Sequence, residues 1–125
     1  MPEEDNKNFL VRKWVPQVEL LAHPALKAGL THCGFGGTLE FISAGKPIVA
    51  FPHFDDQPAD AKELEKRQVA VMLAYREAST FDWYPDQQIS YEEPVFDHNK
   101  VYEVFHEVLT NPKYERNMKK LQKIQ

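Results

Sequence analysis

Short apolar runs alternate with segments of helical periodicity through the first half of the chain. Four runs have the length and the residue types of β-strands: Phe9–Trp14, Ala28–His32, Pro47–Pro52 and Val69–Ala74. The third run is apolar throughout, which is the pattern of a strand buried on both faces of a sheet. These runs therefore predict strands, the third of them buried on both faces.

Helices are predicted between the runs, at Gln17–Ala22, Thr38–Ala44 and Ala59–Arg67. Gly45 is expected to end the second helix, and Pro58 is expected in the first turn of the third. Because strands and helices alternate with short links, parallel pairing with right-handed crossovers is the natural architecture. The expected fold class is α/β, a Rossmann-like parallel sheet with flanking helices.

The second half of the chain begins with a stretch that has no clear period, residues 75–97. Its length and its aromatic and proline content predict a packed surface loop or an irregular insertion. Two helices are predicted beyond it, His98–Thr110 and Pro112–Ile124. The apolar positions expected to face the core are Val101, Val104, Phe105 and Leu109 in the first helix, and Tyr114, Met118, Leu121 and Ile124 in the second.

Composition restricts the class of protein further. A length of 125 residues with 42% hydrophobic residues fits one globular domain, and a formal charge of −4 argues against nucleic acid as a partner. A basic cluster at helical spacing is better explained as a solvated face than as an anion site, and comprises Lys113, Arg116, Lys119, Lys120 and Lys123. The single cysteine excludes an intramolecular disulfide, and no apolar run reaches the roughly 18 residues of a membrane span. A cytoplasmic chain is expected, although a longer parent protein could be membrane-associated.

Candidate chemistry gathers where two neighbouring predicted strands end. His32 ends one strand, and the segment His53–Gln57 follows the next. Ligands of open parallel sheets bind outside the carboxyl ends of the strands. A glycine-rich turn after His32 opens a helix, which directs backbone N–H groups and the positive end of the helix dipole toward an anion. Taken alone, such a turn fits a tight turn without a ligand equally well, and the dinucleotide spacing G-x-G-x-x-G is absent.

Residues 14–57 resemble the signature box of UDP-dependent glycosyltransferases, above all the plant secondary-product enzymes and the animal glucuronosyltransferases. The residues that stand at box positions, in order and without a gap, are Trp14, Pro16, Gln17, Leu21, His23, Thr31, His32, Gly34, Glu40, Gly45, Pro47, Pro52, Asp56 and Gln57. The resemblance implies that residues 1–125 are part of the sugar-donor-binding domain, the C-terminal half of a GT-B fold. Residues 98–124 would be its closing helices.

The resemblance also implies roles for these residues. Trp14 would stack on the uracil ring, and the Val15 backbone would bond the base edge. Gln17 would help to hold the nucleoside, and Glu40 would accept hydrogen bonds from the ribose hydroxyls. The diphosphate would be held by His32, Gly34, Gly36 and Gly37, and the transferred sugar by Asp56 and Gln57.

One position departs from the family pattern. Gly36 stands where relatives carry an asparagine, and a lost hydrogen bond of that kind is worth on the order of 0.5–1.5 kcal/mol. Weaker donor affinity is therefore expected. The UDP-sugar would be a substrate, and neither a cofactor nor a metal is expected.

The implied activity is inverting transfer of a hexose from a UDP-sugar to a small-molecule acceptor. No catalytic residue is assigned, because the family's histidine–aspartate base belongs to an N-terminal acceptor domain that is expected to be missing. The chain alone is therefore expected to be inactive. The alternative is a non-catalytic or split-transferase subunit that binds a partner supplying the acceptor domain.

The family also places two strands before the one that matches Phe9–Trp14, and their expected absence would leave a gap beside Ala28–His32. Buried backbone groups must find partners. The favoured expectation is that Phe9–Trp14 pairs directly with Ala28–His32 in a four-stranded sheet. The alternative is a protein partner that completes the sheet at this open edge.

Overall fold

The computed structural model describes residues 4–5, 8–53, 56–74 and 98–124. The predicted loop at residues 75–97 lies outside the described residues. The elements follow one another in the order β1 (Glu4–Asp5), β2 (Leu10–Val11), α1 (Gln17–Ala22), β3 (Gly29–Thr31), α2 (Phe35–Ala44), β4 (Ile48–Ala50), α3 (Gln57–Lys66), β5 (Ala70–Met72), α4 (His98–Thr110) and α5 (Lys113–Ile124).

The centre of the fold is a parallel sheet with the strand order β3-β4-β5. Its three strands are in flush register, so that Thr31, Ala50 and Met72 lie side by side at the carboxyl ends. All three residues of β4 are buried, as the continuous apolar run predicts. The alternation of strands and helices that the sequence predicts is confirmed. The segments that follow β3 and β4 both leave the sheet at its carboxyl edge.

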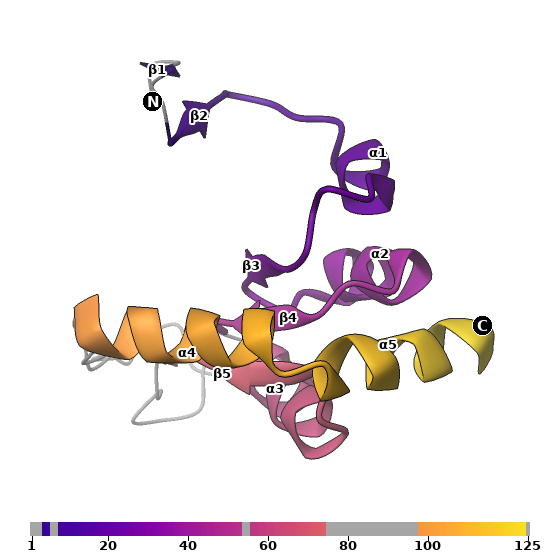
Figure 1. The fold of residues 1–125 in the computed structure, drawn as a ribbon. Helices are drawn as coiled ribbons and strands as arrows, with labels where there is room; N and C mark the ends of the chain where they lie inside the picture. The colour runs from indigo at the N-terminus through magenta and orange to yellow at the C-terminus, as the bar shows by residue number, and fades with distance from the viewer. Residues whose placement is uncertain (1–3, 6–7, 54–55, 75–97, 125) are drawn as a thin grey trace, which may run out of the picture.

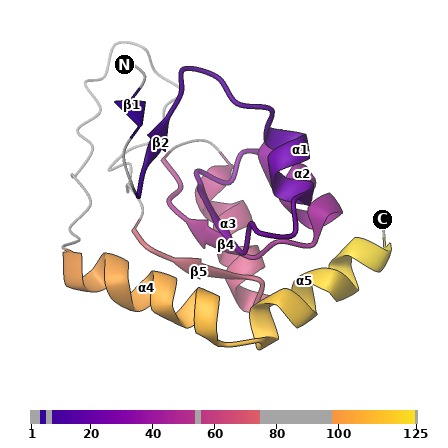
Figure 2. The same cartoon turned by 45° about the horizontal axis from the view of Figure 1, so that its top comes forward.

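Helices cover both faces of this sheet (Figures 1 and 2). On one face, Val49 and Leu73 pack against Val104 and Val108 of α4. The opposite face carries Ile48 and Ala50, and its core also holds Phe41 of α2, Leu64 of α3 and Met118 of α5. The fold is therefore a layered α/β structure in which α2 is fixed against the sheet by burial of its apolar side.

The two C-terminal helices differ in detail from the sequence prediction. Val108 of α4 is buried, whereas Leu109 is 54% exposed and Ile124 of α5 is 79% exposed. The predictions for Leu109 and Ile124 are therefore wrong. Leu109 is exposed because the face of α4 that packs on the sheet is centred on Val104 and Val108, which are four residues apart. Ile124 is the last residue of α5, at the exposed end of that helix.

Helix α2 begins at Phe35, three residues before the predicted start, and ends at Gly45 as predicted. Gly45 adopts the left-handed conformation with φ 69°, and a β-carbon there would come within 2.8 Å of Gln122 Oε1 of α5. The left-handed backbone therefore requires a glycine, and a β-carbon there would also displace the end of the Gln122 side chain.

The prediction that Phe9–Trp14 joins the main sheet is wrong. Its central residues form β2, which pairs antiparallel with β1 in a separate two-stranded sheet. Figures 1 and 2 show this pair apart from β3 and connected to α1 by an extended segment. The local pairing requires closure of only a short loop, which costs less chain entropy than pairing with β3 across α1. Consequently β3 has one neighbour among the described strands, and its Leu30 is 49% exposed.

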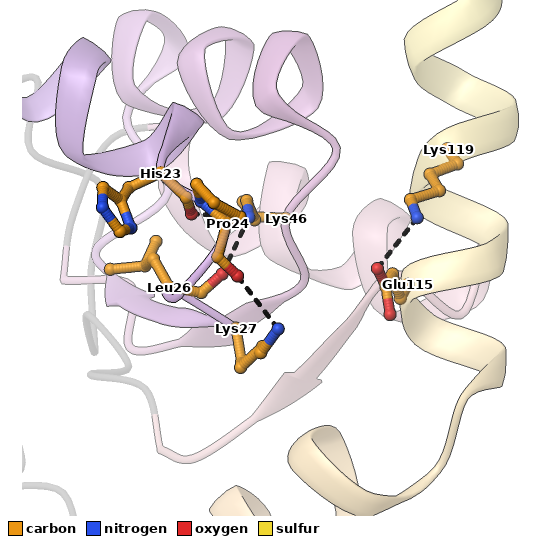
Figure 3. Close-up of polar contacts among 7 residues, drawn as sticks. All are labelled: His23, Pro24, Leu26, Lys27, Lys46, Glu115 and Lys119. Atoms are coloured by element: carbon orange, nitrogen blue, oxygen red, sulfur yellow. Dashed lines mark hydrogen bonds and ion pairs between the residues drawn. The ribbon is translucent and has the colours of Figure 1, made fainter.

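A lysine at the end of α2 fixes α1 beside the sheet (Figure 3). Lys46 Nζ donates hydrogen bonds to the carbonyl oxygens of His23, at 3.0 Å, and of Leu26, at 2.7 Å. Both carbonyls belong to the segment between α1 and β3. The Lys46 cation therefore ties the segment between α1 and β3 to the end of α2.

Candidate functional site

The carboxyl end of β3 turns sharply into α2. Cys33 is fully buried, adopts φ 68°, and donates its backbone N–H to Thr31 Oγ1 at 3.3 Å. This left-handed residue reverses the chain, so that His32 remains exposed at the sheet edge while Gly34 caps the helix. A β-carbon at Gly34 would lie 2.7 Å from His32 Nε2. The imidazole therefore rests directly on the glycine.

The first turn of α2 is open to an anion. Gly34 provides no side-chain cap, so no side chain takes up the first-turn amides. A β-carbon at Gly36 would meet nothing within 4 Å, and one at Gly37 would lie 3.8 Å from Thr31 Oγ1. The positive end of the helix dipole adds to these free donors. This end of α2 can thus accept a negatively charged group close to the main chain.

A cavity of about 500 Å³ opens between α1, β3, α2 and the segment after β4, and its volume is within the range of small-molecule sites. Its lining combines the polar side chains of His32, His53 and Gln17 with a larger number of apolar residues. The complete lining is Val15, Gln17, Leu20, Leu21, Leu26, Gly29, Leu30, Thr31, His32, Gly37, Phe41, Phe51 and His53.

One hydrogen bond joins α1 to α2 at this cavity. Gln17 Nε2, on the first residue of α1, donates to Glu40 Oε2 at 2.7 Å. Glu40 lies about one and a half turns into α2, so the bond joins the start of α1 to the helix that follows the glycine-rich turn. The distance is typical of a hydrogen bond to a charged acceptor.

The segment after β4 is organised by a buried amide. Gln57 is 7% exposed, and its Oε1 accepts the backbone N–H of His53 at 3.1 Å. The His53 ring packs edge-on against Phe51, with the ring centroids 4.6 Å apart. Asp56 is exposed, whereas burial and then the neighbouring Asp56 raise the pKa of Asp60 above its ordinary value.

The structure brings together some of the residues predicted for the site and not others. Val15, Gln17, His32 and Gly37 line the cavity, and Glu40 is joined to them through Gln17. The remaining predicted residues are not among the lining residues: Trp14, Gly34, Gly36, Asp56 and Gln57. Trp14 directly precedes Val15, which lines the cavity, and it is 78% exposed, so its indole is available to a ligand.

Sequence reasoning did not assign His53 to the site, although it lies in the segment predicted to border it. The available signal was its position directly after the buried strand Ile48–Ala50, where side chains point toward the carboxyl edge of the sheet. The apolar lining from α1 was also missed, because Leu20 and Leu21 follow an ordinary helical pattern.

The buried thiol of Cys33 is chemically inert at neutral pH. Burial, followed by the nearby Asp60 charge, raises the pKa of the Cys33 thiol to about 12, so it is protonated at neutral pH and a poor nucleophile. Within the described residues, no three histidine, cysteine or acidic side chains gather in a group that could hold a metal ion. None of the described helices combines the length and the apolar character needed to cross a membrane.

Comparison with known families and proteins gives a consistent picture. All 125 residues match the family model described as "UDP-glucoronosyl and UDP-glucosyl transferase". UDP-glycosyltransferase 74E2 of Arabidopsis thaliana is 43% identical over 63 residues, which cover 50% of this chain and 14% of that protein. Cis-zeatin O-glucosyltransferase 1 of Zea mays is 42% identical over 71 residues, covering 57% and 15% respectively. The matched region is thus about one-seventh of the length of these relatives.

Solved structures share the fold. Os79 from O. sativa, in complex with UDP and deoxynivalenol-3-glucoside, superposes with a TM-score of 0.71 at 30% identity, over 91% of this chain and 24% of that one. UGT2 of Phytolacca americana, complexed with UDP-2fluoro-glucose and pterostilbene, gives the same TM-score at 24% identity, again over 91% and 24%. At that identity the second comparison concerns the fold alone.

Proposed function

Because the chain belongs to the UDP-glucoronosyl and UDP-glucosyl transferase family, we propose that its cavity binds the UDP-sugar donor of an inverting hexosyltransferase. The observation that supports this proposal best is one of position. His32, Gly37 in the uncapped first turn of α2, and Gln17, which is bonded to Glu40, all line a single cavity at the carboxyl edge of the sheet. These groups match the three parts of a nucleoside diphosphate: base and ribose on one side, phosphates on the other.

The diphosphate is assigned to the end of the cavity nearest α2. There, His32 and the amides of Gly36 and Gly37 offer donors, and the helix dipole favours negative charge. Gly34 contributes because its lack of a β-carbon leaves room for the imidazole beside the turn. Charge on the departing UDP increases as the glycosidic bond breaks, so donors fixed in advance stabilise the transition state more than the bound donor.

The nucleoside is assigned to the side formed by the segment before α1. The exposed Trp14 indole offers a face for the uracil ring, and the backbone of Val15 lies at the cavity rim. Gln17 and Glu40 offer polar atoms to the ribose hydroxyls. For the transferred sugar, Asp56 supplies an exposed carboxylate, while Gln57 orients the segment through its bond to the His53 N–H.

In the proposed reaction, an acceptor hydroxyl oxygen attacks the anomeric carbon from the side opposite UDP. The new carbon–oxygen bond forms as the bond to the β-phosphate oxygen breaks, and that oxygen keeps the electron pair. The acceptor proton passes to a base outside the site described here, which is the usual division of general base and leaving-group stabilisation. We assign no residue of this chain as that base, and the small-molecule acceptor is proposed to bind outside the cavity.

Nucleotide binding tests the donor site directly. The chain's other tryptophan is first replaced, Trp83→Phe, so that fluorescence reports on Trp14. Titration with UDP should then change the emission, and Trp14→Phe should bind more weakly than the parent in calorimetry. Trp14→Ala should lose stacking worth roughly 1–3 kcal/mol. A parent chain that does not bind UDP would contradict the assignment of this site.

Turnover is a separate question. We propose that the 125-residue chain alone transfers no sugar, since none of its residues is assigned as the base. Purified chain is incubated with UDP-glucose and a phenolic acceptor, and released UDP is measured against buffer. Release above the uncatalysed background would show that a base is present within the chain.

A further inference from the structure

Helix α5 carries a basic surface that the donor cavity does not use. Four cations and one carboxylate, Glu115, line an open hollow of about 480 Å³ on the exposed side of this helix. The formal charge of the whole chain is −4, so this concentration of positive charge is not explained by the composition. The cations that form this basic face are Arg116, Lys119, Lys120 and Lys123.

The rotation of α5 about its own axis is fixed by the opposite side of the helix. Met118 is fully buried there. Asn117 Nδ2 donates a hydrogen bond to the carbonyl oxygen of Gln68 at 3.2 Å, and Gln122 Nε2 donates to that of Ser43 at 2.7 Å. All four cations of the basic face are exposed, and their spacing of three and four residues places them on one side of the helix. The basic face is therefore presented to solvent as a stripe of fixed orientation.

Little negative charge compensates this stripe. Lys119 Nζ pairs with Glu115 Oε1 at 2.9 Å, whereas the other three cations form no ion pair with any described residue. Two more lysines add to the positive charge from behind. The pKa of Glu115 is lowered first by the hydrogen bond and the charge of Lys119, and then by the charges of Lys27 and Lys46. Figure 3 shows these two lysines across from the Glu115–Lys119 pair.

The residue types favour a lipid surface over a protein as the partner. Lysine is depleted in protein–protein interfaces, whose centres use aromatic anchors. The hollow has three lysines and, among the described residues, no aromatic side chain in its lining. Clusters of roughly four to eight lysines and arginines on an amphipathic helix are typical of binding to anionic lipids. Ile124, which is 79% exposed, lies four residues after Lys120 and so offers an apolar side chain at the edge of the stripe.

We propose that the basic face of α5 is a docking surface for an anionic phospholipid membrane, held chiefly by the charge of its four cations. Docking there leaves the donor cavity uncovered. The cavity is lined by Gly37 from the first turn of α2, whereas α5 contacts the other end of α2 at Ser43. The inference does not depend on the proposed function. Sequence spacing alone favours a solvated face, because it shows neither that only one of the four cations is paired nor that Lys27 and Lys46 lie behind them.

Vesicle binding tests the proposal. The 125-residue chain is mixed with vesicles of phosphatidylcholine that contain about 30% phosphatidylserine, and the bound fraction is measured by sedimentation against vesicles of phosphatidylcholine alone. Binding should require the anionic lipid and should fall as salt rises from about 0.05 M to about 0.5 M, because exposed charges are screened. Equal binding to both kinds of vesicle, or binding to neither, would overturn the proposal.

Charge variants locate the contact on the helix. Each lysine near an anionic surface is worth about a fivefold factor in affinity, so Lys120→Gln with Lys123→Gln should weaken vesicle binding about 25-fold. Lys120→Arg with Lys123→Arg keeps both charges and should bind within about twofold of the parent. The matched control is Arg12→Gln with Lys13→Gln, which removes two exposed cations before α1 and should also bind within about twofold of the parent. If the glutamine pair on α5 binds as tightly as this control, the basic face is not the docking surface.

Competition separates a lipid surface from an acidic protein. Polyglutamate is added to the vesicle-bound chain until its carboxylates equal the accessible phosphatidylserine in concentration. More than half of the chain should stay on the vesicles, because the headgroups present a continuous anionic surface to the whole stripe. Displacement of more than half would overturn the lipid assignment in favour of an acidic protein partner.

Discussion

The imidazole of His32 and the α-carbon of Gly34 are in such close contact that a β-carbon at position 34 would lie 2.7 Å from His32 Nε2. The neighbouring Cys33 is buried with φ 68°, so the backbone between the two residues is fixed. A side chain at position 34 has no room unless the imidazole moves. The orientation of the exposed histidine is therefore set by the absence of a side chain two residues later.

This contact predicts a specific loss of binding. Gly34→Ala should displace the His32 ring and weaken UDP binding about as much as His32→Ala does, since both remove the imidazole from the phosphates. The double variant should be no weaker than His32→Ala alone, because residues in contact are not additive. Calorimetric titration of the three variants with UDP checks this. Strictly additive losses would indicate that the two positions act independently.

Gly36 offers the opposite experiment, a gain of affinity. A β-carbon there meets nothing within 4 Å, so a larger side chain is sterically allowed. Gly36→Asn adds a side-chain amide beside the proposed phosphate position, and one additional hydrogen bond should raise UDP affinity about two- to tenfold. Gly36→Ala is the matched control, which adds a β-carbon without the amide. Equal affinities for the asparagine and alanine variants would place the phosphates elsewhere.

A third glycine is required for packing. A β-carbon at Gly29 of β3 would lie 2.6 Å from the ring atoms Cε1 and Cζ of Phe41, which is buried in the core. Gly29→Ala should therefore lower the free energy of unfolding by about 1–3 kcal/mol through overpacking. Urea unfolding measures the change. Gly36→Ala, at an open helical position, should leave stability unchanged or raise it; a Gly29→Ala variant as stable as the parent would mean that the Phe41 ring can move aside.

The buried thiol predicts a dependence of stability on alkaline pH. The pKa of Cys33 is raised from the ordinary 9.0 to about 12, so the folded state keeps a proton that the unfolded state loses. Stability should be unaffected by this group below pH 9 and should fall as pH rises from 9 toward 12, with a slope of at most about 1.4 kcal/mol per pH unit. The pKa of Tyr114 is also raised to about 12, so the parent must be compared with Cys33→Ala to isolate the thiol. Parallel pH profiles for the two proteins would contradict this.

The sequence predicted the core of the fold well because the relevant signals are local. The continuous apolar run ending in Pro52 predicted the buried strand β4, and Gly45 marked the end of α2 at the residue where the left-handed conformation occurs. Helix α4 begins and ends at the predicted residues. Such boundaries depend on residue type and on short-range geometry, so the sequence alone is enough to predict them.

Predictions that depended on long-range pairing were less successful. The strand propensity of Leu10 and Val11 was real, but propensity does not specify a partner, and β1 lies nearer along the chain than β3. Similarly, the residue types at positions 17 and 40 did not predict that Gln17 would line the cavity and that Glu40 would not. Which of these two side chains faces the cavity depends on how α1 packs on α2, and no local sequence pattern predicts that packing.

The open edge of β3 has a consequence for the exchange of backbone protons with solvent. The Gly29 N–H donates to Pro47, and the Thr31 carbonyl accepts from the Phe51 N–H, so both residues direct their backbone groups to β4. Leu30, between them, must direct its own N–H to the opposite edge, where no described strand lies. In deuterium oxide, the Leu30 amide should therefore exchange far sooner than those of Gly29 and Thr31. The exchange rates of these three consecutive amides can therefore be compared within one experiment. Slower exchange of the Leu30 amide alone would indicate that another chain has paired with this edge of the sheet.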